Sequence, residues 1–255
     1  MMQNLVKDSC GSPLLEIVLK ELDKKTYENF FKEHFKGKLQ EMSLPSQRDF
    51  KTSNHVIQQI LASAPSIEIL NECIEELKPI FKECYQQNKM GIILAIFNAS
   101  NNLAGKCSDK EKLHEISRAQ QSLSKLILET ASISVGKEWK TLVGKLLGNS
   151  DGSSDFFNYL GSMILIAMTK FVSYNSAKAV FEGFASMNRK MLLALCKSSN
   201  GSRLVESYLD SKDSIRSKNN VIKKISGSFA EVCCVLSLFQ MNVQLPILTI
   251  KLTTI

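Results

Sequence analysis

The chain has 255 residues and 44% of them are hydrophobic, so it is long enough for one large domain or a repeat array with a continuous core. Its 12 glycines and 5 prolines are few, a balance that favours helices over a sheet-rich fold. The formal net charge of +7 fits a polyanionic partner or an ordinary basic protein equally well, and the longest apolar run (163–168) is too short to span a bilayer, so we expect no membrane segment.

The first predicted helix follows Gly11, with Leu14, Leu15, Val18, Leu19 and Leu22 on one face. A serine and a glutamate four residues apart, Ser12 and Glu16, share another face of this helix. Pro13 lies between them, where its ring could lie flat on a nucleic-acid base. A second helix carries Tyr27, Phe30, Phe31, His34 and Phe35 along one side. We interpret His34 as a boundary residue of that face, not as a ligand.

The next predicted helix, residues 53–61, repeats this arrangement with different chemistry. Asn54 and Gln58 are four residues apart, and His55 stands beside Asn54. Both side-chain amides donate and accept, so together they match the donor and acceptor on a uracil edge. His55 would then stack on the base. The alternative for His55 is an exposed polar residue at a helix start.

The middle of the chain offers less polar chemistry. A clean amphipathic period predicts a helix over 67–81, and a short apolar helix follows over 89–97. Gly91 and Ala95 fall at the repeating position but carry no group that could bind a base edge. Residues 98–112 are expected to form a loop, residues 113–130 a helix, and residues 134–154, with four glycines, a flexible insertion. At 161–166 the pattern returns with Ser162 and Ile166 in place of the polar pair.

The strongest copy of the pattern lies at residues 200–209. Ser202 and Glu206 are four residues apart on one helix face, and Arg203 stands beside them. A glutamate accepts hydrogen bonds from the two adjacent N–H groups of guanine, while a guanidinium stacks on the face of the base. On the following helix, three lysines fit either phosphate contacts or a solvated helix face. They are Lys218, Lys223 and Lys224.

The intervals between these copies indicate a repeat. They are 42 residues from Ser12 to Asn54, 37 from Asn54 to Gly91, 71 from Gly91 to Ser162, and 40 from Ser162 to Ser202. The interval of 71 leaves room for two units. A helical unit that recurs near 37 residues predicts an all-α solenoid, in which each unit buries its apolar face against the next.

Sequence motifs give no support to catalysis. Gly105, Lys106 and Cys107 lack the upstream glycine and the Ser/Thr of a phosphate-binding loop, and the nucleophile-elbow and zinc-protease motifs do not occur. We therefore expect no catalytic residue, no metal site and no cofactor. Seven cysteines without a regular spacing indicate reduced thiols in the cytosol or nucleus, and the first seven residues lack the apolar segment of a signal peptide.

These motifs resemble the Pumilio (PUF) repeat family, in which each repeat presents two edge-reading side chains four residues apart and a stacking residue after the first. Asn54, His55 and Gln58 match a uracil-reading triplet, and Ser202, Arg203 and Glu206 a guanine-reading one. Ser12 and Glu16 also match guanine, with a departure at Pro13. The degenerate, widely spaced repeats are similar to the divergent nucleolar branch of the family, the Nop-nine type and its plant Pumilio-twenty-three relatives.

The resemblance implies five to six repeats over residues 1–231, partly degenerate, and an atypical tail over 232–255. It implies binding of single-stranded or structured pre-ribosomal RNA during maturation of the small-subunit (18S) rRNA, in the nucleus and nucleolus. It also implies that the protein is a monomer and that pre-ribosomal proteins are further binding partners. On the same grounds the chain is expected to be a C-terminal-half fragment that lacks the helix preceding its first reading helix.

The alternative hypothesis is a protein-binding solenoid of the HEAT or armadillo type, which would share the period and composition. Polar pairs beside a stacking residue distinguish the two, because a protein-binding groove has no need of them. An RNA-binding array should place Ser12, Asn54 and Ser202 on one face.

Overall fold

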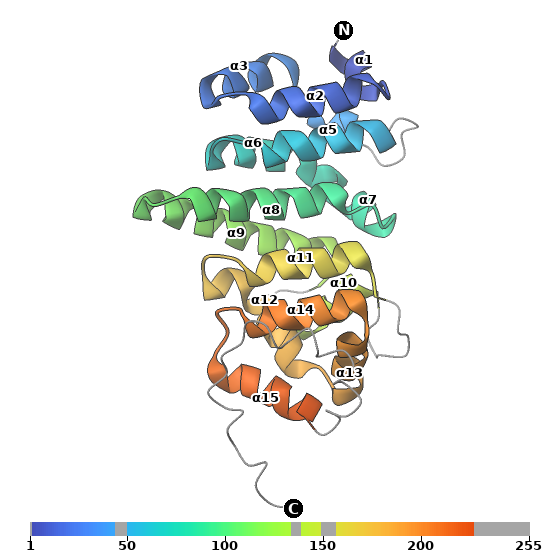
Figure 1. The fold of residues 1–255 in the computed structure, drawn as a ribbon, viewed down its shortest axis with the longest axis vertical. Helices are drawn as coiled ribbons and strands as arrows, with labels where there is room; N and C mark the ends of the chain where they lie inside the picture. The colour runs from blue at the N-terminus through green and yellow to red at the C-terminus, as the bar shows by residue number, and fades with distance from the viewer. Residues whose placement is uncertain (1, 44–49, 134–138, 149–156, 227–255) are drawn as a thin grey trace, which may run out of the picture.

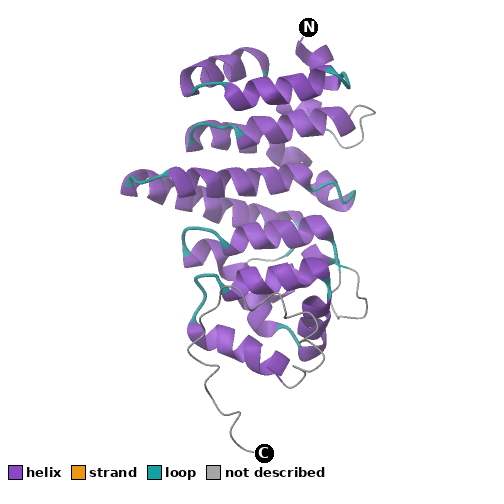
Figure 2. Cartoon of the chain, in the orientation of Figure 1, coloured by secondary structure: helices purple, strands orange, loops and turns teal. Residues whose placement is uncertain are grey.

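The computed structural model describes residues 2–43, 50–133, 139–148 and 157–226, and every regular element within these ranges is helical (Figures 1 and 2). The helices follow one another in five groups. The first group is α1 (Met2–Lys7), α2 (Gly11–Glu21) and α3 (Lys24–His34), and the second is α4 (Leu39–Met42), α5 (Phe50–Ala62) and α6 (Ile67–Leu77). The 3-10 turn η1 (Lys78–Ile80) leads into the third group, which is α7 (Phe81–Gln86), α8 (Gly91–Lys106) and α9 (Lys110–Thr130). The fourth group is the 3-10 turn η2 (Trp139–Thr141) with α10 (Leu142–Leu147), α11 (Tyr159–Thr169) and α12 (Tyr174–Ser186). The fifth group is α13 (Arg189–Lys197), α14 (Ser199–Leu209) and α15 (Ile215–Ser226).

The second α-helix of each group packs on its counterpart in the next group. Contacts join α2 to α5, α5 to α8, α8 to α11 and α11 to α14. Figure 1 shows these five helices one below another along the long axis, and we call them the second-helix layer. The predicted all-α solenoid is thereby confirmed.

Three helices of this layer begin with the same local motif. A polar side chain accepts a hydrogen bond from the backbone N–H of a glycine three residues later, which satisfies a donor that the helix itself leaves free. The pairs are Asp8 with Gly11 (2.7 Å), Asn158 with Gly161 (2.9 Å) and Ser198 with Gly201 (2.9 Å).

The glycines of this motif allow a close approach between the first and second helices of a group. A Cβ atom at Gly161 would lie 1.9 Å from the carbonyl oxygen of Leu146, and one at Gly201 would lie 2.4 Å from that of Leu195. Neither distance is possible for a real side chain, so only glycine fits. The motif therefore fixes where α11 and α14 start against the helices that precede them.

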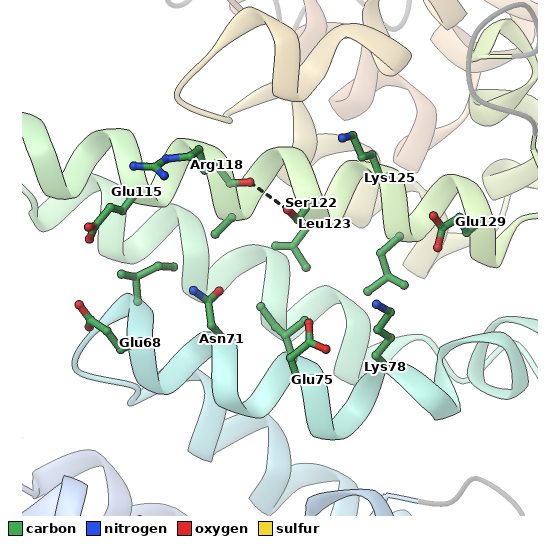
Figure 3. A pocket seen from close by; sticks show the side chains of 14 residues that line it. Glu68, Asn71, Glu75, Lys78, Glu115, Arg118, Ser122, Leu123, Lys125 and Glu129 are labelled. Atoms are coloured by element: carbon green, nitrogen blue, oxygen red, sulfur yellow. Dashed lines mark hydrogen bonds between the residues drawn. The ribbon is translucent and has the colours of Figure 1, made fainter.

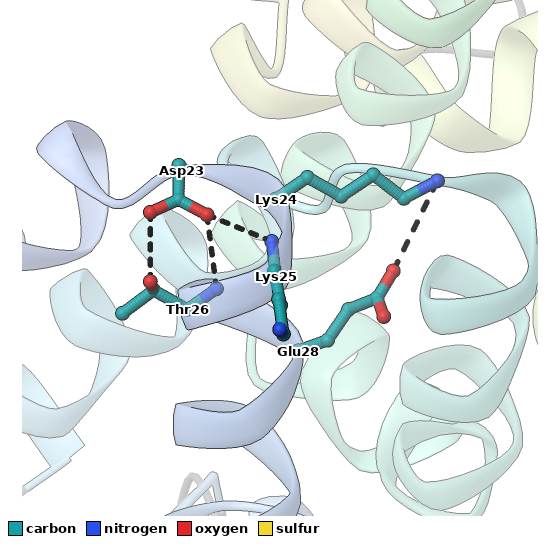
Figure 4. Close-up of polar contacts among 5 residues, drawn as sticks. All are labelled: Asp23, Lys24, Lys25, Thr26 and Glu28. Atoms are coloured by element: carbon teal, nitrogen blue, oxygen red, sulfur yellow. Dashed lines mark hydrogen bonds and ion pairs between the residues drawn. The ribbon is translucent and has the colours of Figure 1, made fainter.

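A capping aspartate starts α3 (Figure 4). The Asp23 carboxylate accepts hydrogen bonds from the backbone N–H groups of Lys25 (3.0 Å) and Thr26 (3.1 Å) and from the Thr26 hydroxyl (2.7 Å). These bonds, with the hydroxyl first, hold the pKa of Asp23 below its ordinary value. Lys24 and Glu28 add an exposed ion pair of 4.0 Å, which contributes little to stability.

The predicted loop over 98–112 is wrong. α8 continues to Lys106, because Ser100 is fully buried and the Asn101 side chain bonds to the neighbouring group. Only residues 107–109 separate α8 from α9, and Asp109 caps the start of α9. Polar residues misled the prediction because here they bond inside the interface instead of facing water.

The flexible insertion predicted for 134–154 is also corrected in part. Residues 139–147 form η2 and α10, and four apolar side chains of α10 are buried: Leu142, Val143, Leu146 and Leu147. The rest of the predicted insertion, 134–138 and 149–154, lies outside the described residues. α10 acts as the first helix of the fourth group.

The spare length between Gly91 and Ser162 does not hold another second helix. α8 contacts α11 directly, so no unit lies between them. The 16 residues of α8 and the 21 residues of α9 take up part of the interval. Long helices, and not an extra repeat, explain the irregular spacing.

A helix does precede the one that carries Ser12, contrary to the sequence-based expectation. α1 contacts α2 and α5, and Val6 buries its side chain there. The side of α2 that faces away from α5 is different, because Leu14 and Ile17 are each 61% exposed and Val18 is 38% exposed. No described helix covers these three side chains.

A buried amide network joins the third and fourth groups. Gln120, which is fully buried in α9, donates from Nε2 to Asn101 Oδ1 (3.1 Å) and accepts at Oε1 from the Val172 backbone N–H (2.8 Å). Asn101 donates in turn to the Ala167 carbonyl at the end of α11 (2.8 Å). Both polar ends of Gln120 are satisfied, as a buried amide requires.

We expect Gln120→Met to destabilise the fold. The substitution keeps the volume but leaves Asn101 Oδ1 and the Val172 N–H without this partner, at about 1–3 kcal/mol for each unpaired group. Urea denaturation followed by circular dichroism measures the loss. Ser122→Ala, at an exposed position of the same helix, is the control and should unfold at the same urea concentration as the wild type. Equal midpoints for both variants would contradict the structural role of the network.

Candidate nucleic-acid interface

Buried apolar residues set a common register in the second-helix layer. In α5, α11 and α14 they fall two, three and six places after a shared starting position, which is Asn54, Ser162 or Ser202. The buried sets are Val56, Ile57 and Ile60; Ile164, Leu165 and Met168; and Leu204, Val205 and Tyr208. Since equal offsets on a helix point in equal directions, these three polar residues occupy equivalent places in the array.

The same register corrects the assignment in α8. Its buried residues Ile92, Ile93 and Ile96 place the starting position at Met90, which is itself 1% exposed, and not at Gly91. Leu94 is then the second residue of the pair, and Gly91 stands where His55 and Arg203 stand in α5 and α14. The sequence could not reveal this shift of one residue, because residues 90–97 are almost uniformly apolar.

The α5 triplet presents polar atoms that the chain itself does not satisfy. His55 is exposed, while Asn54 and Gln58 are half-buried. Asn54 Oδ1 is shielded from solvent and has no hydrogen-bond partner. An unpaired buried acceptor is uncommon in a folded protein, so this atom has a hydrogen-bonding capacity that a ligand could use.

The α14 triplet lies beside a groove between α11 and α14. Arg203 and Glu206 are exposed, and Ser202 is half-buried, with its hydroxyl donating to the Ser199 carbonyl (3.1 Å). No described residue forms an ion pair or hydrogen bond with the Arg203 guanidinium. Its planar face is therefore available for stacking.

The groove itself has a volume of about 560 Å³ and mixed chemistry. Met163 and Ile166 of α11 form an apolar wall opposite Arg203 and Glu206. A hydrogen bond of 2.6 Å between the Thr169 and Ser207 hydroxyls joins the two helices. The remaining lining residues are Lys170, Asp210, Ser211 and Lys212. A thioether opposite a guanidinium suits a flat ring placed between them.

The other two copies of the pattern expose less polar chemistry. In α2, Pro13 is exposed and Glu16 half-buried, but Ser12 is only 4% exposed. In α11, Ser162 is 1% exposed and donates its hydroxyl to the Asn158 carbonyl (2.8 Å). The structure thus brings all predicted triplets into one layer. In two of them, those of α5 and α14, polar groups are accessible to a ligand.

Comparison with known proteins shows the family to which this architecture belongs. Residues 1–237 match the family model of the NOP9-like PUF repeat domain. The chain belongs to the NOP9-like PUF repeat family. Pumilio homolog 23 of Arabidopsis thaliana is 26% identical over 239 residues, covering 89% of this chain and 29% of that protein. Nucleolar protein 9 of Homo sapiens is 21% identical over 250 residues, covering 90% of this chain and 37% of that protein.

Solved structures of a PUF protein share the fold. The structure of APUM23–GGAGUUGACGG has a TM-score of 0.75 at 22% identity, and covers 90% of this chain and 42% of that chain. The structure of APUM23–GGAAUUGACGG has a TM-score of 0.74 at 24% identity, with the same coverage. The present chain therefore spans less than half the length of these relatives and structures.

The three lysines that fit either phosphate contacts or a solvated helix face lie on α15, outside the second-helix layer. Lys224 donates to the carbonyls of Ala185 (2.9 Å) and Met187 (2.7 Å), and so caps the end of α12. Lys218 donates to the Ser211 carbonyl, while Lys223 is exposed. Two of the three ammonium groups are therefore already bonded to backbone carbonyls near the ends of α12 and α14.

A second groove lies between α6 and α9, with a volume of about 690 Å³ (Figure 3). Charged side chains of α9 stand on one rim, and those of α6 and the adjoining turn η1 stand on the other. The carboxylates are Glu68, Glu75, Glu115 and Glu129, and the cations are Lys78, Arg118 and Lys125. With more carboxylates than cations, this groove suits a polyanion less well than the α11–α14 groove does.

The described residues contain no cluster of side chains that could hold a metal ion, and none of the described helices is long and apolar enough to cross a membrane. Three of the thiols in the described ranges are buried, and burial raises the pKa of Cys84 and of Cys196 to about 11 and raises that of Cys73 as well. Cys10 is exposed, just before Ser12.

We expect iodoacetamide at pH 7.5 to modify Cys10 well before Cys84 and Cys196. The thiolate is the reactive form, and the two buried thiols stay protonated until the pH nears 11. Peptide mass spectrometry over time gives the rates. If α2 takes part in binding, added RNA should slow the modification of Cys10. Cys107, which follows the C-terminal end of α8, is the control and should be modified at the same rate with and without RNA. Similar rates at Cys10 and Cys84 would contradict the burial described above.

Proposed function

We propose that this chain binds single-stranded RNA through the second-helix layer. The observation that carries the proposal is the equivalent placement of two polar triplets in α5 and α14, each with an open stacking residue. A protein-binding solenoid gains nothing from an unpaired Asn54 acceptor or from a guanidinium beside Glu206. RNA bases supply hydrogen-bonding edges and flat faces together.

Each triplet selects a base by its hydrogen-bonding groups. The amides of Asn54 and Gln58 offer both donors and acceptors, which suits the mixed edge of uracil. The Glu206 carboxylate only accepts, so it suits the two adjacent N–H groups of guanine, with Ser202 beside it. His55 and Arg203 stack on the faces of these bases, and Pro13 with Glu16 and Ser12 forms a weaker third site.

The RNA we propose is pre-ribosomal RNA during maturation of the small-subunit (18S) rRNA, in the nucleolus. The relatives named Nucleolar protein 9 and the APUM23–GGAGUUGACGG structure support this choice. The repeats at 1–231 would act as a monomeric binding array without catalysis, and pre-ribosomal proteins would be further partners. The tail at 232–255, which lies outside the described residues, would take no part in base reading.

We expect the purified chain to bind single-stranded RNA with an affinity that falls steadily as salt rises. Lys and Arg displace counterions from phosphates, so the logarithm of the affinity should fall linearly with that of the salt concentration over roughly 50–200 mM. Gel-shift titrations measure this slope. Duplex DNA of matched length is the control, and equally tight binding to it would contradict the proposal.

We expect Asn54→Ser with Gln58→Glu to change the preferred base at one RNA position from U to G. The new carboxylate would meet a uracil oxygen and leave a buried charge unpaired, at a cost of about 1–3 kcal/mol. Binding selection on randomised RNA measures the preferred base at every position. The preferred bases at the other positions should not change.

His55→Ala is the matched contrast in the same selection. It removes stacking but no edge contact, so binding should weaken by about 1–3 kcal/mol with little change in base choice. If the double variant keeps the wild-type preference, α5 does not read RNA and a HEAT-type or armadillo-type protein-binding function gains support.

A further inference from the structure

Gly91 lies directly beside the amide pair of α5. A Cβ atom at Gly91 would stand 3.0 Å from Gln58 Nε2 and 3.7 Å from Asn54 Nδ2. No backbone atom lies among the nearest neighbours of this Cβ position, in contrast to Gly161 and Gly201, whose neighbours are helix carbonyls. The atoms that would have to shift to admit a side chain at residue 91 are therefore the ones that the proposed RNA site uses.

The backbone of α8 does not itself require glycine at this place. The described glycines with a left-handed backbone are Gly37 and Gly148, and Gly91 is not among them. Residue 91 opens a regular helix, where most side chains are compatible with the backbone. Packing between helices also fails to explain the glycine, since its contacts are with polar side-chain ends.

The register of the layer gives Gly91 a role in the site. On α14 the corresponding residue is Arg203, which forms part of one wall of the α11–α14 groove, across from Ile166 of α11. On α8 that wall is missing. A base held by Asn54 and Gln58 would therefore stack on His55, with no side chain at residue 91 to cover its other face.

We propose that Gly91 is a specificity-determining residue of the α5 site. It holds no base itself. Its missing side chain lets the Gln58 and Asn54 amides reach a base edge and leaves the second face of that base uncovered. This inference rests on the proposed RNA-binding function and concerns how one helix of the array, without a polar pair of its own, shapes the site of its neighbour.

The test compares Gly91→Ala with Gly105→Ala in the same helix. A Cβ atom at Gly105 would meet nothing within 4 Å, so this variant changes helix propensity alone. Both variants should fold, with melting temperatures at or above that of the wild type. Only Gly91→Ala should lower the base discrimination at the RNA position read by α5, by roughly three- to tenfold, since one Cβ displaces part of a two-bond contact.

A double-mutant cycle shows whether the effect passes through Gln58. In a Gln58→Ala background, Gly91→Ala should cause no further loss of discrimination, because the displaced amide is already absent. An additive loss would overturn the inference, and so would a Gly91→Ala variant that reads RNA as Gly105→Ala does. A wild-type chain without base preference at any position would instead overturn the proposed function itself, and the inference with it.

Discussion

Apolar contact between successive second helices is the constraint on which the rest of the structure depends. In α5, α8, α11 and α14, residues two, three and six places after the starting position are buried. Each such side chain contributes about 1.5–3 kcal/mol when it leaves water, so a rotation of any helix would expose several of them at once. Fixing the rotation of each helix also fixes the direction of its polar residues. The placement of Asn54 and Ser202 is a consequence of packing.

Small polar and glycine contacts then set the distances between neighbouring helices. Gly161 and Gly201 let α11 and α14 rest against the backbone of the preceding helix, and Gln120 joins the third group to the fourth. Between α6 and α9 the helices separate, which leaves the charged groove of Figure 3. Both close contacts and grooves occur along the array, so its surface differs from group to group.

The chemistry of the second-helix layer is unevenly distributed. α5 and α14 carry open triplets, whereas α8 presents Met90 and Leu94, and α11 presents a serine whose hydroxyl already bonds to the backbone. Such an array suits selective recognition at a few bases, with the intervening helices shaping the neighbouring sites. Gly91 is the proposed instance, since a side chain there would meet the Gln58 and Asn54 amides of α5.

The sequence by itself determined the helical class, the repeat and the polar triplets, because helical spacing and residue chemistry are local properties. It also determined that Asn54 and Gln58 share a face, which follows from their separation of four residues. Burial in the tertiary structure was needed to place Met90 at the starting position of α8, since an apolar run gives no register until a neighbouring helix selects one face. The end of α8 and the helix at 142–147 were likewise settled by partners distant in sequence. Local pattern specifies what a helix can present, and packing against other helices decides which side it presents.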